Sequence, residues 1–491
     1  MNHIIKYKNH LIVLFLLIIA RLPSFFERWW YGDENIYLAI AQALSNGDKL
    51  YVDIWDNKPP LLYFIYYVIY NIFNTNIIGY KLFNLILTFL FIILIVEVGK
   101  QLFNVKNTNL LWIIATLVGI FGYEMSILNA ENVYVPLILL GLLTFSKFIH
   151  SDSKLYLLGS AFFFSLAGLC KLPALFEVLA LSTVLIILYY SKLNINKILN
   201  FIFILIAPYL TVILYYLSIG KLEVFYQSIL GFSSDYLAKV YPIVIGIPLI
   251  FTDNLKWRFL LLFIFLILLA ISYYKSHVDK ITTILLAWFS ISLFSSFISD
   301  RNYPHYLIQL YQSLIIGIVL IVQTFKNKNF YQIFITAFIT LTMLNSVIQN
   351  FTSMQQLSYY NMNSYFNFMK LATNNITLDQ FQESADQSGY QAEKELLPII
   401  NQNTKPNDYI YLFTNNPEIY PLSKRKPALK YTAIYQLPTI DNSTLETLNK
   451  SSLLIFQKSE KIDKYTELLK NYSNIINTKN YIIFKRNKKI L

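Results

Sequence analysis

The stretch FNLILTFLFIILIVEVG, residues 83–99, decides the class of fold. It approaches the ~20 apolar residues that an α-helix needs to cross the hydrocarbon core of a bilayer. LIVLFLLIIA (11–20) and RFLLLFIFLILLAISYY (258–274) repeat the pattern. Of the 491 residues, 56% are hydrophobic, and the mean hydropathy is +0.47. A soluble domain needs a larger polar share to cover its surface, so the sequence predicts an integral membrane protein.

The charge and cysteine content exclude several classes of function. The net charge is +12, which in a soluble protein would suggest a nucleic-acid partner. Here the lysines lie in short loops between apolar runs, where they set topology, so we expect no nucleic acid. The single Cys170 excludes an intramolecular disulfide and a cysteine metal cluster. The segment ARLPSFFERWWYG (20–32) has no small-x-small cleavage site, so we expect the first apolar run to remain as a helix.

The apolar runs predict about eleven membrane spans. They are expected at roughly 10–26, 77–99, 109–126, 131–149, 155–170, 173–190, 197–217, 256–274, 281–298, 305–324 and 330–349.

The lysines predict the orientation of these spans. If the N-terminus is cytoplasmic, every second loop carries lysine and lies inside, as the positive-inside rule requires. These inner loops hold Lys100 and Lys106, Lys154, Lys192 and Lys197, Lys275 and Lys280, and Lys326 and Lys328. The composition is rich in Asn, Lys and Ile, which is typical of an AT-rich bacterial genome. We therefore expect a multi-pass protein of the bacterial inner (cytoplasmic) membrane, with its C-terminal region outside.

The predicted fold class is an all-α polytopic membrane protein with a C-terminal extracytoplasmic α/β domain. The transmembrane domain is expected over 1–350, with an outer loop at 27–76, and the soluble domain over 351–491. In the latter, DYIYLF (408–413), SSLLIFQ (451–457) and YIIFKR (481–486) read as strands. EKIDKYTELLKNYSNII (460–476) has apolar residues at helical spacing and reads as a helix.

The outer loop 27–76 is rich in ionisable residues, although only 14% of the residues in the whole chain are charged. Its run ENIYLAIAQAL (34–44) has the pattern of an amphipathic helix on the membrane surface. Asp33 stands where an N-cap belongs, and Gly47 where a helix stops. Asp33 is therefore either a helix cap or a general base at the membrane edge, and the two roles are compatible. Glu34 points about 100° away around the helix, so the two carboxylates need not share one task.

The motif DNKPPL (56–61) follows in the same loop. Two prolines bias Lys58 to an extended conformation and stand where the next helix begins. The aromatic run after them is short, as in an interfacial helix. Lys58 snorkels to the membrane interface, pairs with Asp53 or Asp56, or contacts a phosphate with its ammonium group. Asp56 is a further active-site candidate.

Other candidates lie at outer helix ends. DRNYPHY (300–306) groups Arg301, Tyr303 and His305, which suit phosphate binding. His305 has the alternative of acting as an acid or base, and a surface role for the group stays open. Glu131 and Lys171 are ionisable residues close to the membrane core, where such groups are costly and often functional. Lys171 has the alternative of snorkelling to the interface.

These motifs, in this order, resemble the GT-C superfamily of membrane glycosyltransferases. The likeness is to family 39, which includes dolichyl-phosphate-mannose–protein mannosyltransferases and bacterial aminoarabinose transferases acting on lipid A. It rests on GDENIY (32–37), GDKLYVD with DNKPPL (47–61), Glu131 and RNYPHY (301–306), and it covers roughly residues 10–325.

The resemblance implies sugar transfer from a polyprenyl-phosphate-sugar donor, with inversion. Asp33 matches the family's catalytic aspartate, and Glu34 completes that acidic pair. Lys58 matches a lysine that contacts the lipid phosphate, and Arg301, Tyr303 and His305 fall in a region that helps to hold it. Lysine and arginine can stand in for a metal ion, so we expect that the reaction requires no metal or other cofactor. Use of a divalent cation is the alternative.

The acceptor is left open between a glycolipid, a glycan and a protein hydroxyl, and membrane lipids surround the protein. A transporter or flippase of lipid-linked sugars is the alternative function. It would place its ionisable residues near mid-membrane in broken helices, whereas most candidates here lie at outer edges. A non-enzymatic assembly factor is a third reading, and it leaves the amphipathic outer loop joined to NKPPL unexplained.

Overall fold

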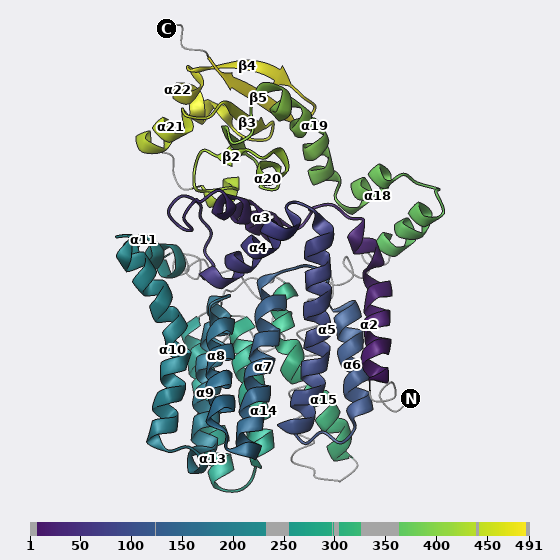
Figure 1. Ribbon diagram of the computed structural model, residues 1–491, viewed down its shortest axis with the longest axis vertical. Coiled ribbons are helices and arrows are strands. Elements are labelled where there is room, and N and C mark those ends of the chain that lie inside the picture. The colour runs from purple at the N-terminus through teal and green to yellow at the C-terminus, as the bar shows by residue number, and fades with distance from the viewer. Residues whose placement is uncertain are drawn as a thin grey trace. The chain divides into compact units, whose positions relative to one another are not determined.

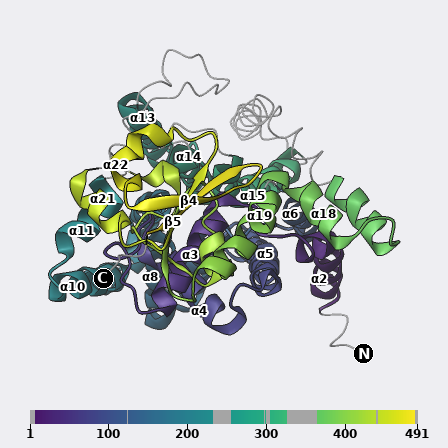
Figure 2. The ribbon, with the colours of Figure 1, turned by 90° about the horizontal axis from the view of Figure 1, so that it is seen from above.

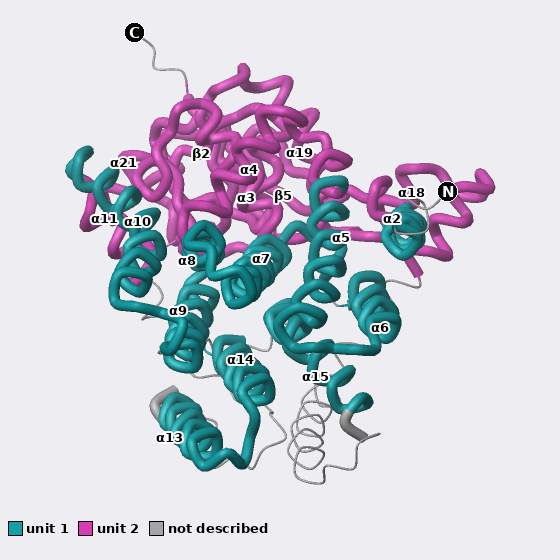
Figure 3. The backbone as a smooth tube through the Cα atoms, turned by 60° about the horizontal axis from the view of Figure 1, so that its bottom comes forward, with its two compact units in different colours: residues 1–22, 82–220, 231–362 teal, residues 23–81, 221–230, 363–491 magenta. Residues whose placement is uncertain are grey.

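A computed structural model describes the chain in seven segments: residues 7–122, 124–231, 255–296, 298, 304–325, 363–437 and 441–487. The chain forms two compact units (Figure 3). Unit 1 comprises residues 1–22, 82–220 and 231–362, and unit 2 comprises residues 23–81, 221–230 and 363–491. The domain boundary predicted at residue 350 lies outside the described residues.

Unit 1 is a bundle of apolar helices (Figure 1). In it, α7 packs on α8, α8 on α9 and α10, and α14 on α9, α13 and α15. Its helices are α2 (Lys8–Arg21), α5 (Ile77–Gln101, which begins in unit 2), α6 (Thr108–Phe121), α7 (Ala130–Ser151), α8 (Lys154–Gly168), α9 (Leu172–Leu188), η2 (Tyr190–Lys192), α10 (Ile195–Ser218), α13 (Leu255–Tyr274), α14 (Lys280–Ser296), η5 (Pro304–Leu307) and α15 (Ile308–Phe325).

Every expected span up to residue 324 coincides with a helix, because a long apolar run can satisfy its backbone in a membrane only by coiling. The span expected at 109–126 ends earlier, at Phe121, because Gly122 takes an extended conformation. The span expected at 330–349 lies outside the described residues. Five described segments are long and apolar enough to cross a membrane: Lys8–Phe25, Ile77–Gln101, Ala130–Ser151, Ile195–Ser218 and His305–Gln323. Six shorter apolar helices accompany them, and the chain is a multi-pass membrane protein.

Unit 2 contains a five-stranded sheet of order β2-β1-β3-β5-β4, with β2, β1 and β3 parallel and β5 antiparallel to both β3 and β4. The strands are β1 (Tyr409–Phe413), β2 (Lys426–Pro427), β3 (Leu453–Gln457), β4 (Tyr472–Asn477) and β5 (Tyr481–Arg486). The remaining elements of unit 2 are η1 (Leu22–Phe25, at the boundary with unit 1), α3 (Gly32–Ser45), α4 (Pro60–Phe73), α11 (Leu222–Tyr226), the π-helix η3 (Gln227–Gly231), α18 (Leu378–Ala385), α19 (Gln387–Asn403), α20 (Ile419–Ser423), η6 (Ile434–Gln436), α21 (Asn442–Leu448), η7 (Ile462–Tyr465) and α22 (Thr466–Leu469).

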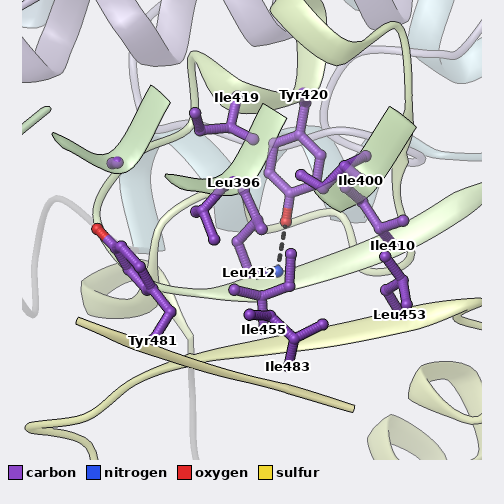
Figure 4. Packing of buried hydrophobic residues seen from close by; sticks show 11 residues of the cluster. Leu396, Ile400, Ile410, Leu412, Ile419, Tyr420, Leu453, Ile455, Tyr481 and Ile483 are labelled. Carbon is purple, nitrogen blue, oxygen red and sulfur yellow. Dashed lines mark hydrogen bonds between the residues drawn. The ribbon is translucent and has the colours of Figure 1, made fainter. Parts of the chain in front are cut away.

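The sheet is packed on both faces because successive side chains of a strand point to opposite sides. Along β1, Ile410 and Leu412 lie in a cluster with residues of α19 and α20, shown in Figure 4. Tyr411 and Phe413 lie in a second cluster with residues of α21 and α22. Figure 2 shows α19 on one side of the sheet and these two short helices on the other. The Tyr420 hydroxyl accepts a hydrogen bond of 3.0 Å from the backbone N–H of Leu412.

The three strands expected in the C-terminal region are confirmed, but the helix expected over 460–476 is wrong in its second half. Helical turns cover only Ile462–Leu469, and Tyr472–Asn477 forms β4. The backbone of β4 pairs with β5 through a ladder with a bulge at Asn474/Ile476. Tertiary strand pairing therefore overrides the local helical pattern.

The outer loop contributes α3 and α4 to unit 2. The expectation that α3 lies on the membrane surface stays a prediction; within the protein, every residue from Glu34 to Ala43 is buried. Its polar side is covered by the C-terminal domain: Asn35 donates to Glu418 (2.9 Å), and Gln42 to the Tyr420 carbonyl (3.4 Å).

The boundaries of α3 test the capping predictions. The N-cap predicted at Asp33 is wrong, because α3 begins at Gly32 with Tyr31 as N-cap, and Asp33 lies in the first helical turn. The stop at Gly47 is confirmed. The helix ends at Ser45, and Gly47 adopts a φ of 89°, a conformation that glycine takes without strain.

Candidate active site

The starts of α3 and α4 bring two oppositely charged side chains together. Asp33 lies in the first turn of α3, and Lys58 stands directly before the two prolines that open α4. Lys58 Nζ is 3.5 Å from Asp33 Oδ2. The side chains are 29% exposed for Asp33 and 14% for Lys58, so the pair is partly open to solvent. A base and a cation thus share one partly desolvated position, where electrostatic interactions are stronger than in bulk water.

Tyr37, one helical turn after Asp33, supports both members of the pair. Its hydroxyl donates to Asp33 Oδ2 at 3.1 Å, and Lys58 Nζ lies 5.0 Å from the centre of its ring. A hydrogen bond from a neutral donor holds a carboxylate in a fixed direction, and the ring face attracts the ammonium group. The first turn of α3 therefore orients both charged groups.

The conformation of Lys58 is fixed by its own backbone. Pro59 and Pro60 restrict it from one side, as the sequence predicted. The backbone N–H of Lys58 donates to the Tyr63 hydroxyl at 3.1 Å, and its carbonyl accepts from the Tyr51 hydroxyl at 2.5 Å. Because both backbone groups are hydrogen-bonded to buried tyrosines, the backbone position from which the Lys58 side chain extends is fixed.

Asp56 is the second carboxylate beside Lys58 and is buried. Its Oδ2 lies 3.4 Å from Lys58 Nζ and accepts from the Tyr63 hydroxyl at 2.8 Å. Of the two partners expected for Lys58 within the loop, Asp56 is thus confirmed. Asp53 instead accepts from the backbone N–H of Lys49 at 2.8 Å and shapes the loop.

Glu34 has a different environment from its neighbour Asp33. Its Oε2 lies 3.2 Å from Lys81 Nζ at the start of α5, and both side chains are almost fully buried. Buried charges in proteins need such a partner, because an isolated one carries a large desolvation cost. Glu34 thus ties the start of α3 to α5, as its 100° offset from Asp33 allows.

Unit 1 holds a second group of candidates. Glu131, at the start of α7, pairs with Lys171, which directly precedes α9. The Lys171 ammonium lies 4.2 Å from the centre of the Tyr306 ring. His305 Nδ1 is 3.1 Å from Glu124 Oε2, and its ring meets that of Tyr306 edge-on at 4.5 Å. The structure therefore brings Glu131, Lys171 and His305 into one connected cluster within the bundle.

Two sequence-predicted phosphate contacts, Arg301 and Tyr303, lie outside the described residues. Asp33, Glu34, Asp56 and Lys58 are all in unit 2, and Glu131, Lys171 and His305 are in unit 1. Within the described segments, no group of three or more His, Cys, Asp or Glu side chains is placed to hold a metal ion. The expectation that no metal ion or other cofactor is required stays a prediction.

Sequence reasoning missed several residues of the site. Tyr37 had a usable signal, because it follows Asp33 by four residues on a helix and so shares its face. Lys81 and Tyr63 carry no such signal, since their contacts depend on how α3, α4 and α5 pack. Gln436, which donates to Asp56 Oδ1 at 3.4 Å, is 380 residues away in the chain.

A further buried carboxylate, Glu177 in α9, was also missed. It accepts hydrogen bonds from Trp288 and Ser292, both at 2.8 Å, and from Gln309 and Gln312. These donors come from α14 and α15, so Glu177 joins three helices of the bundle. An acidic residue in an apolar helix was the signal that could have drawn attention to it.

Comparisons with known proteins agree with this architecture. A family model described as dolichyl-phosphate-mannose-protein mannosyltransferase matches residues 57–219, which include Lys58, Glu131 and Lys171. No curated protein matches the chain in sequence. Chains of solved structures match in fold, among them ArnT from Cupriavidus metallidurans bound to undecaprenyl phosphate. That match has a TM-score of 0.56 and 12% sequence identity, and it covers 97% of each chain.

These findings confirm the resemblance that the motifs indicated. They also confirm the fold class, since the chain shares with ArnT a fold of many apolar helices joined to a small C-terminal sheet.

Proposed function

We propose that this protein is an integral membrane glycosyltransferase. It moves a sugar from a polyprenyl-phosphate-linked donor to an acceptor hydroxyl, with inversion at the anomeric carbon. The observation that carries the proposal is the 3.5 Å approach of Lys58 Nζ to Asp33 Oδ2 at the meeting point of α3 and α4. Two comparisons support the same donor chemistry: the match to the mannosyltransferase family model, and the fold shared with ArnT, whose structure contains undecaprenyl phosphate.

The proposed step needs one base and one cation. Asp33 accepts the proton of the acceptor hydroxyl while that oxygen forms a bond to the anomeric carbon. The bond between the anomeric carbon and the phosphate oxygen breaks, and its electron pair leaves with the polyprenyl phosphate. Negative charge grows on that oxygen in the transition state, and the Lys58 ammonium stabilises it. Because the pair is only partly exposed, water screens this interaction less than it would at an open surface.

The other candidates take supporting roles in this proposal. Arg301, Tyr303 and His305 contribute donors to the phosphate, and Glu131 with Lys171 fixes the helix ends beside His305. Glu34, through its pair with Lys81, holds the turn that carries Asp33. The reaction takes place on the outer face of the bacterial cytoplasmic membrane, since the lysine-bearing loops are assigned to the inside.

The test replaces the two central residues in cells. Asp33→Asn and Lys58→Ala are each expected to abolish the sugar modification while the protein level is unchanged. Asp48→Asn and Lys49→Ala, in the same loop, are the matched controls, and we expect them to retain modification. The readout is mass spectrometry of surface glycolipids and glycoproteins from cells with and without the gene, which also identifies the sugar and the acceptor. Normal modification by both test variants would refute the mechanism.

A further inference from the structure

A loop of the C-terminal domain, residues 430–436, contacts the segment that carries Lys58. We call it the clamp loop. The backbone N–H of Trp55 donates to the Lys430 carbonyl at 2.8 Å, and the Trp55 ring packs edge-on against Tyr431 at 5.3 Å. One residue further along, Asp56 accepts a hydrogen bond from Gln436. Both segments belong to unit 2, so the C-terminal domain is built into the surroundings of the proposed site.

The orientation of the Gln436 amide is fixed within the clamp loop. Its Oε1 faces the backbone N–H groups of Thr432 (3.2 Å) and Ala433 (3.3 Å), which can only donate. The amide NH₂ must then point the other way, toward Asp56 Oδ1 at 3.4 Å. Gln436, Thr432 and Ala433 are all buried. A flipped amide would place its NH₂ group against the two backbone N–H donors and its oxygen against Asp56 Oδ1, which is an acceptor. Only one orientation of the amide is therefore favourable.

Asp56 is shared between the clamp loop and Lys58. Its Oδ1 accepts from Gln436, and its Oδ2 accepts from Tyr63 and lies beside Lys58 Nζ. The neutral donors satisfy part of the hydrogen-bonding capacity of the carboxylate. Lys58 is then held less tightly by Asp56, and more of its attraction for an anion is directed outward. Removal of a neutral donor shifts that balance toward a closed Lys58–Asp56 pair.

We infer that Gln436 is a positioning residue, which acts through Asp56 to keep the Lys58 ammonium available to the phosphate of a polyprenyl phosphate. The C-terminal domain is then part of the donor site. The inference rests on the proposed function, since it takes Lys58 as the phosphate contact. It predicts that loss of the Gln436 side chain weakens binding of the phosphate group and leaves binding of the lipid chain unchanged. A general loss of folding would weaken both.

The test measures binding of undecaprenyl phosphate, and separately of undecaprenol, to the full-length protein in nanodiscs. For Gln436→Ala we expect binding of undecaprenyl phosphate to weaken about five- to tenfold, the scale of one hydrogen bond beside a charged group. Binding of undecaprenol should change by less than about twofold, because it has no phosphate. Gln391→Ala is the matched control. It removes a side-chain acceptor of Asn480 in the same domain and should leave both affinities unchanged.

A second variant separates positioning from packing. Gln436→Glu keeps the size of the side chain but sets a carboxylate against Asp56. Its loss of affinity relative to the unmodified protein should be larger at pH 8 than at pH 5, because protonation restores a donor. Equal loss for undecaprenyl phosphate and undecaprenol, or no loss in Gln436→Ala while Lys58→Ala weakens phosphate binding, overturns this inference alone. Unchanged phosphate binding in Lys58→Ala instead overturns the proposed function.

Discussion

Glu34 Oε2 lies 3.2 Å from Lys81 Nζ, and both side chains are almost fully buried. Its neighbour Asp33 is 29% exposed and faces Lys58. Two consecutive carboxylates of one motif therefore have separate tasks. Glu34 ties two helices together in the interior, and Asp33 is partly exposed to solvent. Adjacent residues on a helix point about 100° apart, which is what makes this division available.

The Glu34–Lys81 pair predicts a non-additive effect on stability. Lys81→Met leaves the Glu34 charge buried without its cation and should lower the free energy of unfolding by about 3–5 kcal/mol. The double variant Glu34→Gln/Lys81→Met should cost clearly less than the sum of the single changes, since no charge is stranded. Thermal unfolding of the detergent-solubilised protein measures all variants. Strict additivity would show that the two side chains do not interact.

Tyr37 predicts a graded effect on turnover. Tyr37→Phe removes the hydroxyl that donates to Asp33 and keeps the ring beside Lys58. We expect turnover to fall roughly tenfold, equivalent to about 1.4 kcal/mol, as for a hydrogen bond to a charged group. Tyr37→Leu removes both contacts and should be slower still. The assay is the sugar transfer identified by mass spectrometry, and equal rates for the two variants would exclude a role for the ring.

Glu418 predicts a dependence of stability on pH. It is fully buried, and burial raises the pKa of its carboxyl from 4.5 to about 7, although the nearby Arg28 opposes the shift. Because this pKa is higher in the folded protein, the folded state holds a proton that the unfolded state has released between pH 4.5 and 7. Stability should therefore fall as pH rises through that window, by about 1.4 kcal/mol per pH unit at most, and level off above it.

The check compares the unmodified protein with Glu418→Gln, whose neutral amide imitates the protonated acid. The difference in melting temperature between the two should grow from pH 5 to pH 7 in favour of the variant. Arg28 also pairs with Asp386 and Glu393, so it keeps its partners when the Glu418 charge is removed. Glu446→Gln, at an exposed position of α21, is the control. A difference that does not vary with pH would contradict the raised pKa.

Glu177 predicts a large effect inside the helix bundle. Glu177→Leu would leave the donors of Trp288 and Ser292 without their acceptor, and each unsatisfied buried group costs about 1–3 kcal/mol. Glu177→Gln keeps one acceptor oxygen and should be milder. The matched control in the same helix is Ser182→Ala, since the buried Ser182 hydroxyl lacks a hydrogen-bond partner among the described residues. Melting temperatures in detergent compare the stability of the three variants. A Glu177→Leu variant as stable as Ser182→Ala would contradict the prediction.

The described helices of unit 1 and three strands of the sheet could be predicted from the sequence alone. An apolar run of membrane length has one way to satisfy its backbone, and a strand such as YIIFKR has strong local preferences. The motif residues Asp33 and Lys58 were also found from the sequence, because two prolines and an acidic pair are visible without a structure. The segment 472–477 was not, since its strand exists only through its pairing with β5.

The sequence by itself thus determined a membrane-embedded bundle, the lysine pattern of its loops and the candidate base and cation. Only the tertiary structure decided which partner each charge takes: Lys81 for Glu34, Asp56 and Asp33 for Lys58, and Gln436 for Asp56. It also decided that α3 is buried beneath distant segments of the chain, which its amphipathic pattern does not show. The physical reason is that a hydrophobic pattern records which residues avoid water, whereas pairing of polar groups depends on which distant segment covers them.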